Sequence, residues 1–295
     1  MPPPHASCSP PLACSVRACG QPLERTSQTW ACPAGHSFDI ARSGYVNLLQ
    51  PQDRRSAHAG DSPAAIEARQ HLIAAGVGVG LREMAIDLIA GLALGRSPVV
   101  LELGCASGDL LGRLGERTAS CTVGIDLAAS AVARAARAFP AGTWVVANAD
   151  RRLPIRDASV SVVLSVHARR NPEECARVLA PDRPLVVIVP AADDLIELRE
   201  AVFGQRIEHP RAERLAEEHA PYFALVSRSE HRERVLLPVD QLDHLLTGTY
   251  RAGRTTAATA RASLEPMTVT LASDILVFQV RDQAGSTESG SLARR

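Results

Sequence analysis

From residue 97 onward, short apolar runs alternate with segments whose apolar residues recur at helical spacing. Runs of this length are typical of buried strands, and the segments between them have the length of helices. Buried strands separated by helices form right-handed crossovers, so the pattern predicts a mostly parallel sheet covered by helices on both faces. The expected strands are residues 97–104, 121–126, 143–150, 160–168 and 184–190, and the expected helices are residues 109–118, 129–140, 172–180 and 194–204.

The pattern changes toward the carboxyl end of the chain. The apolar runs 267–272 and 274–280 are separated only by a short turn, which predicts a terminal antiparallel hairpin at one edge of the sheet. Residues 211–223 and 238–250 have helical periodicity. We expect these two helices to form a wall over the carboxyl ends of the strands.

Composition divides the chain into five segments, and no internal repeat is visible. The 295 residues, 46% of them hydrophobic, are enough for one large domain with a small appendage. Both ends are polar or rich in Pro and Ser without periodicity, which is typical of disorder. The segments are a disordered start (1–13), a cysteine-bearing module (14–49), a linker with helices (50–96), the α/β domain (97–282) and a disordered tail (283–295).

Charge and composition narrow the class of protein. The formal net charge is zero, so a nucleic-acid partner would have to be met by a local basic patch. All 32 basic residues are arginine, which most simply reflects a GC-rich coding genome. The first residues lack the features of a signal peptide, and no apolar run is long enough to span a membrane. We therefore expect a cytoplasmic protein, in which clustered thiols are metal ligands more often than disulfides.

Two close pairs of metal-ligand residues precede the α/β region. Cys14 and Cys19 form C-x4-C, and Cys32 with His36 forms C-x3-H, with twelve residues between the pairs. Four such ligands suit tetrahedral Zn²⁺ with no open position, so the expected site is structural. The residues between the pairs can form a short hairpin that brings the pairs together. Two alternatives stay open: Cys8 could replace Cys14, or the four residues could be unligated in a reduced protein.

A second group of candidate residues follows the first predicted strand. Gly104 and Gly108 allow a sharp turn before a helix, and Asp126 ends the second strand, where a carboxylate can accept both ribose hydroxyl protons. This spacing alone does not separate NAD from S-adenosylmethionine. Ala106 at the middle glycine position, the acidic Glu102 within the strand and the terminal hairpin resemble a class I methyltransferase instead. A glycine turn that binds nothing stays open as an alternative.

Polar residues at the ends of later strands are further candidates for this site. Asn148 and Asp150 end the third strand, where methyltransferases commonly hold the adenine amino group, although such residues are also common in turns. His167 follows the fourth strand, near the expected position of a methyl acceptor, with Arg169 and Arg170 beside it. The pattern identifies no catalytic base.

Taken together, the motifs resemble one family. The runs "CGQPL", "CPAGHSFDIARSGYVNLL", "GDSPAAIEAR" and "LELGCASGD" are similar to those of the bacterial 23S rRNA (guanine-N1)-methyltransferases, which include housekeeping and macrolide-resistance enzymes. The resemblance covers most of the chain. It implies a substrate guanine in a hairpin of 23S rRNA near the macrolide site. It also implies that zinc is held by Cys14, Cys19, Cys32 and His36, that Asp126 meets the ribose, and that the S-adenosylmethionine loop is lined by Gly104, Ala106, Ser107 and Gly108.

Several positions depart from the pattern of that family. The first cysteine pair is C-x4-C where the family has C-x2-C, and Gly78 stands where the family has an aromatic residue against the cofactor. Asp182 and Arg183 replace glycines before the fifth strand, and Arg169 replaces a proline. Asp194 corresponds to a histidine near the cofactor, so the resemblance places it among the cofactor contacts.

Two other functions stay open at this point. A small-molecule methyltransferase of antibiotic biosynthesis would use the same cofactor site but would leave the zinc segment unexplained. A non-catalytic zinc-binding and RNA-binding relative would explain the altered cofactor loop. The zinc module has two expected roles: it can grip structured RNA through phosphate contacts of Arg17, Arg25 and Arg42, or it can brace a homodimer.

Overall fold

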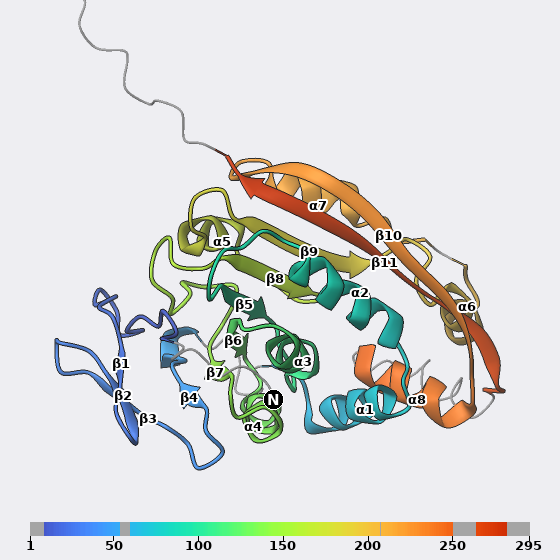
Figure 1. Ribbon diagram of the computed structural model, residues 1–295. Coiled ribbons are helices and arrows are strands. Elements are labelled where there is room, and N and C mark those ends of the chain that lie inside the picture. The colour runs from blue at the N-terminus through green and yellow to red at the C-terminus, as the bar shows by residue number, and fades with distance from the viewer. Residues whose placement is uncertain (1–8, 54–59, 207, 250–263, 282–295) are drawn as a thin grey trace, which may run out of the picture.

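The computed structural model describes residues 9–53, 60–206, 208–249 and 264–281, and its central element is an eight-stranded sheet (Figure 1). The strands of this sheet are β4 (Val46–Asn47), β5 (Val99–Leu103), β6 (Cys121–Asp126), β7 (Thr143–Val146), β8 (Val162–Val166), β9 (Pro184–Pro190), β10 (Phe223–Leu237) and β11 (Met267–Val280). Their spatial order is β10-β11-β9-β8-β5-β6-β7-β4. All neighbours from β9 to β4 are parallel, which confirms the predicted mostly parallel sheet.

Helices cover both faces of the sheet, as the pattern predicts. The helices are α1 (Pro63–Ala74), α2 (Val79–Ala90), α3 (Asp109–Arg117), α4 (Ala129–Ala138), α5 (Pro172–Val178), α6 (Ile196–Phe203), α7 (Ala212–His219) and α8 (Val239–Thr249). Apolar residues of α2, α3 and α4 form the core on one face, and those of α5 and α7 contribute to the core on the other. None of the helices in the described ranges is both long and apolar enough to cross a membrane.

The antiparallel part of the sheet differs from the prediction. The hairpin expected within residues 267–280 is wrong, because β11 is one continuous strand that pairs with β9 on one side and β10 on the other. The polar residues at the expected turn are satisfied inside the sheet: Asp274 pairs with Arg228 of β10 at 3.0 Å, and Ser273 lies 3.0 Å from the His167 ring. The antiparallel pair therefore consists of β10 and β11.

The cysteine-bearing segment forms a small sheet that is continuous with the large core. Strands β1 (Glu24–Arg25), β2 (Thr29–Ala31) and β3 (Ser37–Asp39) are antiparallel, which confirms the hairpin expected between the two ligand pairs. A short 3-10 helix, η1 (Pro51–Asp53), follows β4. Leu12, Trp30 and Leu48 are buried in the same cluster as side chains of the large sheet.

Only one of the two helices expected as a wall lies near the carboxyl ends of the strands. Helix α8 packs on α1, where the Arg69 guanidinium donates to the Gly248 carbonyl. In turn, α1 reaches the loop that follows β5 through Gln70. Helix α7 instead buries Ala212 and Leu215 in the core on one face of the sheet. The expected wall is therefore correct for α8 and wrong for α7.

Candidate functional site

The turn after β5 is tight, and its two glycines are sterically required. Gly104 and Gly108 have φ of 74° and 77°, the left-handed region that favours glycine. A Cβ atom at residue 104 would lie 2.3 Å from the Cβ of Ala168, and one at residue 108 would lie 2.5 Å from the Trp144 ring. Larger residues at either position would force the loop away from the sheet.

Asp126 is joined directly to this loop, as the sequence predicts. Its Oδ2 accepts a hydrogen bond from the Ala106 N–H at 2.9 Å, and its Oδ1 accepts one from the Ala128 N–H at 2.8 Å. Burial raises the pKa of the Asp126 carboxyl above its ordinary value, although both N–H groups act in the opposite direction. Ala106 has a φ of 46°, a conformation that costs a non-glycine residue about 1–2 kcal/mol. The Asp126 bond holds Ala106 in this conformation.

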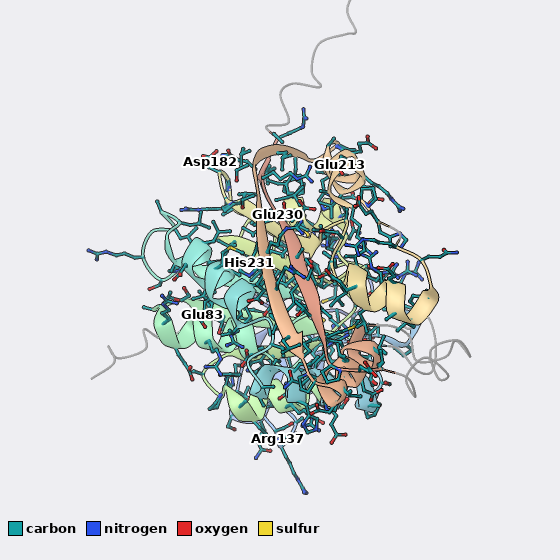
Figure 2. All side chains as sticks on the ribbon, turned by 90° about the vertical axis from the view of Figure 1, so that its right-hand side faces the viewer. Glu83, Arg137, Asp182, Glu213, Glu230 and His231 are labelled. Carbon is teal, nitrogen blue, oxygen red and sulfur yellow. The ribbon has the colours of Figure 1, made fainter. Side chains whose placement is uncertain are left out.

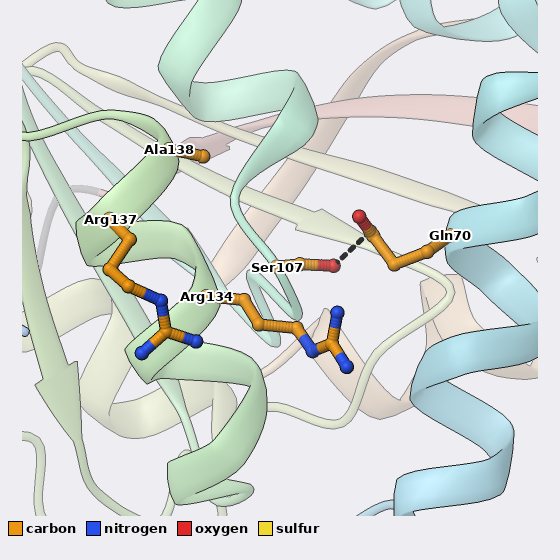
Figure 3. A pocket seen from close by; sticks show the side chains of 5 residues that line it. All are labelled: Gln70, Ser107, Arg134, Arg137 and Ala138. Carbon is orange, nitrogen blue, oxygen red and sulfur yellow. Dashed lines mark hydrogen bonds between the residues drawn. The ribbon is translucent and has the colours of Figure 1, made fainter.

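Helix α1 supplies a contact to the loop that the sequence does not predict. The Gln70 Nε2 donates to the buried Ser107 Oγ at 2.5 Å, and Figure 3 shows the two side chains meeting across the gap between α1 and the loop. No local pattern could have identified this pair, because the residues are 37 positions apart. The Ser107 hydroxyl thus ties the predicted cofactor loop to the helical linker.

Glu102 is a buried carboxyl group next to the loop, and its environment fits a cationic ligand. The side chain is 4% exposed, and within the described residues its Oε2 has no hydrogen-bond partner. Burial and the nearby Asp126 and Asp109 carboxylates raise the pKa of Glu102 to about 8. S-adenosylmethionine carries a sulfonium and an ammonium group, and a nearby positive charge would favour the ionised carboxylate.

Replacing Glu102 by glutamine is expected to remove a pH dependence of stability. The folded protein keeps the Glu102 proton up to about pH 8, whereas the unfolded chain loses it near 4.5. The folded state therefore binds more protons in this window, so the free energy of unfolding falls as the pH rises, by up to ~5 kcal/mol. The Glu102→Gln protein should lack this fall and melt at a higher temperature than the wild type at the upper end of the window. Thermal unfolding without cofactor from about pH 5 to about pH 8 measures this difference. The same decrease of stability with pH in both proteins would contradict the raised pKa of Glu102.

The other predicted cofactor contacts have partners within the protein. The Asn148 amide donates to the Asp53 carbonyl at 2.8 Å and accepts from the Asp150 N–H at 3.0 Å. The Asp150 carboxylate pairs with Arg169 at 2.9 Å. Asp194 accepts from the Ala272 N–H of β11 at 3.0 Å, and burial raises its pKa to about 6. Among the described residues, no hydrogen bond or ion pair joins Asp194 to the Gly104–Gly108 loop.

The segment after β8 carries polar side chains near the expected acceptor position. His167 has a φ of 49°, and its Nε2 lies 3.0 Å from the Ser273 Oγ. Burial and the positive charges of the Arg211 and Arg69 guanidinium groups lower the pKa of His167 to about 4, so the ring is neutral at pH 7. Arg170 donates to the His219 Nε2 at 3.2 Å, which fixes this guanidinium against α7.

The four predicted metal ligands converge on one point. Their ligand atoms all lie within 4.8 Å of one another. The His36 Nδ1 is 3.5 Å from the Cys14 sulfur and 3.4 Å from the Cys32 sulfur, and the Cys19 and Cys32 sulfurs are 3.9 Å apart. Zinc bonds of about 2.3 Å to sulfur and about 2.0 Å to nitrogen place tetrahedral corners about 3.8 Å (S to S) and about 3.5 Å (S to N) apart. The donor set therefore fits zinc.

Two departures from the family pattern have visible structural consequences. The longer C-x4-C loop is accommodated by Ala18 with a φ of 62°, and Cys14 takes part in the cluster, whereas Cys8 lies outside the described residues. Asp182 has a φ of 59°, which explains why glycine is the usual residue there. Arg183 donates to the Ala93 carbonyl at 3.0 Å and so joins two turns of the fold.

Comparisons with known proteins agree with this arrangement. Residues 13–57 match the family model "RlmA, N-terminal", a zinc ribbon, and residues 100–182 match the model "Methyltransferase domain". The chain is 34% identical over 290 residues to the "Putative 23S rRNA (guanine-N(1)-)-methyltransferase" of Micromonospora griseorubida, which covers 91% of this chain and 97% of that protein. It is 35% identical to the 23S rRNA (guanine(748)-N(1))-methyltransferase of Streptomyces fradiae, over 77% of this chain and 81% of the relative.

The similarity thus extends over both the zinc module and the methyltransferase sheet. A relative from Bacillus subtilis, YxjB, is 34% identical over 57% of this chain and 60% of its own length, and it has the same guanine-N(1) methyltransferase name. With near-complete coverage at this level of identity, the chain belongs to the family of 23S rRNA (guanine-N1)-methyltransferases.

Proposed function

We propose that this protein transfers the methyl group of S-adenosylmethionine to N1 of a guanine in a hairpin of 23S rRNA. The observation that carries the proposal is the Gly104–Gly108 loop, which Asp126 braces at the carboxyl end of β5. Leu103 of β5 is buried in the same cluster as Cys14 and Cys32 of the metal site. The named relatives support the choice of RNA over a small molecule as substrate. A zinc module would have no evident purpose in a small-molecule methyltransferase.

The chemistry requires positioning more than charge stabilisation by the protein. Guanine N1 carries a proton and becomes a good nucleophile only as that proton leaves, whereas the sulfonium methyl group is already activated. The protein must therefore hold the guanine and the methyl group in line and provide an acceptor for the N1 proton.

At the level of residues, we propose two binding sets. The cofactor loop comprises Gly104, Ala106, Ser107 and Gly108, with Asp126 on the ribose, because these groups converge at one edge of the sheet. Cys14, Cys19, Cys32 and His36 hold one structural Zn²⁺, which when bound closes the module and leaves no position for a substrate. Asn148, Asp150 and Asp194 bond to Asp53, Arg169 and Ala272, which lie outside this loop, and this argues for a role in supporting the site.

Methylation of an RNA fragment tests the proposal directly. The purified protein should methylate a 23S rRNA hairpin fragment, and primer extension should stop at a guanine because a methyl group on N1 blocks Watson–Crick pairing. An RNA in which that guanine is replaced by adenine should give no stop. Methyl transfer to small metabolites without transfer to RNA would favour the small-molecule alternative. Absence of cofactor binding with intact RNA binding would favour a non-catalytic protein.

Macrolide resistance is the biological role that we propose for the modification. The proposal rests on the resemblance to resistance enzymes and on the relative from Streptomyces fradiae, whose name specifies guanine 748. A susceptible host that expresses the gene should tolerate more macrolide than a host that expresses a methylation-defective variant. Equal susceptibility of the two strains, with the methylated guanine present, would indicate a housekeeping role.

A further inference from the structure

Helix α4 carries two exposed arginines that the site described above does not use. Arg134 and Arg137 lie on its solvent-facing side, and the helix has no acidic residue. Within the described part of the chain neither guanidinium forms an ion pair or a hydrogen bond. Many other arginines do, for example Arg82 with Asp109 at 2.7 Å and Arg228 with Asp274 at 3.0 Å. None of the described residues therefore neutralises the charge on α4.

A third arginine of this kind lies where the zinc module contacts α4. A Cβ atom placed on Gly44 would be 3.8 Å from the Cβ of Ala136, so the turn between β3 and β4 packs on α4 one residue before Arg137. Arg42 belongs to this turn, is exposed and has no ionic partner among the described residues. The zinc module and α4 thus present unpaired positive charge on adjoining surfaces.

The same carboxyl-terminal half of α4 also lines a hollow beside the cofactor loop. A cavity of 340 Å³ is lined by Gln70 of α1, Ser107 of the loop, and Arg134, Arg137 and Ala138 of α4. Figure 3 shows the Arg134 guanidinium extending into the space between α4 and α1, and Figure 2 shows Arg137 at the outer end of the molecule. The hydrogen bond between Gln70 and Ser107 joins the two residues that line this cavity on the side of the cofactor loop.

We propose that Arg42, Arg137 and Arg134 form an arginine track that binds backbone phosphates of the substrate RNA and leads them from the zinc module to the cofactor loop. The inference rests on the proposed function and adds the surface that holds the RNA. Guanidinium groups bind phosphate oxygens through planar paired donors, and phosphate contacts position a nucleic acid without reading its sequence. The cavity beside Ser107 admits a phosphate group at the point where the track meets the cofactor loop.

The salt dependence of RNA binding distinguishes this track from ordinary surface charge. Each lost phosphate contact should make the slope of log affinity against log salt shallower by about one. A triple variant with Arg42→Gln, Arg134→Gln and Arg137→Gln should therefore have a slope shallower by about three and bind the 23S rRNA hairpin about tenfold or more weakly at moderate salt. Arg96→Gln is the matched control, because Arg96 is exposed but precedes the amino end of β5, the edge of the sheet opposite the cofactor loop.

These arginines could instead bind the carboxylate of S-adenosylmethionine, and cofactor affinity measured by calorimetry distinguishes this role from the arginine track. The triple variant should bind the cofactor as tightly as the wild type, and its melting temperature should be unchanged because all three side chains are exposed. A loss of cofactor affinity with an unchanged RNA slope would overturn the track. So would equal slopes for the triple variant, the control and the wild type. If the wild-type protein itself neither bound nor methylated the RNA, the proposed function would fail instead.

Discussion

An Asp126→Ala protein should lose nearly all affinity for S-adenosylmethionine and, with it, methyl transfer. The carboxylate would accept both ribose hydroxyl protons while it holds the loop through Ala106. Hydrogen bonds to a charged group contribute about 1.5–3 kcal/mol each, so the loss of two lowers affinity by about a hundredfold or more. Without the carboxylate, the Ala106 N–H also loses its hydrogen-bond acceptor, so nothing holds Ala106 in its left-handed conformation. The resulting change of the loop should lower cofactor affinity further. Isothermal titration calorimetry with the cofactor measures the effect.

The matched control for this substitution is Glu116→Ala. Glu116 is an exposed carboxylate near the end of α3, the helix that follows the cofactor loop. Its side chain makes none of the contacts that hold this loop. Its removal should leave cofactor affinity within about twofold, because isolated surface charges contribute little. If Asp126→Ala also stayed within that range while remaining folded, the ribose assignment would be wrong.

A Cys32→Ser protein should lose its zinc and the order of residues 14–49. The wild type is expected to contain about one Zn²⁺ per chain, since the four ligand atoms form a closed tetrahedral set. Removing one thiolate leaves three ligands, and metal binding provides much of the folding free energy of such small modules. Metal analysis should find the variant depleted. Hydrogen exchange should accelerate in β1, β2, β3 and β4, because Trp30 and Leu48 then lose their packing.

Cys175→Ser provides the control for a lost thiol. Cys175 is a buried free cysteine on α5, so its replacement disturbs the core without touching the zinc ligands. This variant should keep its zinc and its slow exchange in residues 14–49 even if its melting temperature falls. Full zinc content in the Cys32→Ser protein would refute the metal site.

The parallel sheet and both candidate sites could be predicted because their signals are local. Apolar runs define β5 to β9, and closely spaced ligand pairs define the metal cluster. Strand β10 gives no such signal, since residues 228–234 are polar or charged. It is a strand because β11 offers it a long antiparallel partner, and Arg228 and Arg232 find carboxylates on neighbouring elements. Pairing between distant residues, rather than local preference, decides this part of the fold.

The candidate site shows the same division. Gly104, Gly108 and Asp126 could be assigned because turn, strand end and spacing are all visible in the sequence. The Gln70 to Ser107 contact could not be assigned, because it depends on how α1 packs. Asn148 and Asp194 both come soon after a strand, as a ligand contact would, yet they bond to Asp53 and Ala272. The type of a polar residue and its position after a strand do not determine whether its side chain faces a ligand or another segment of the chain.

The pairing of β4 with β7 also bears on how the molecule avoids self-association. Val46 and Asn47 lie beside Val145 and Val146, and the Leu48 N–H continues the ladder to the Val146 carbonyl. Without these residues, β7 would be an apolar edge strand with unpaired backbone groups, the kind of edge that recruits strands from other chains. The metal-binding segment is therefore also a protective cover, and a methyltransferase domain expressed from the linker onward would carry an unprotected edge.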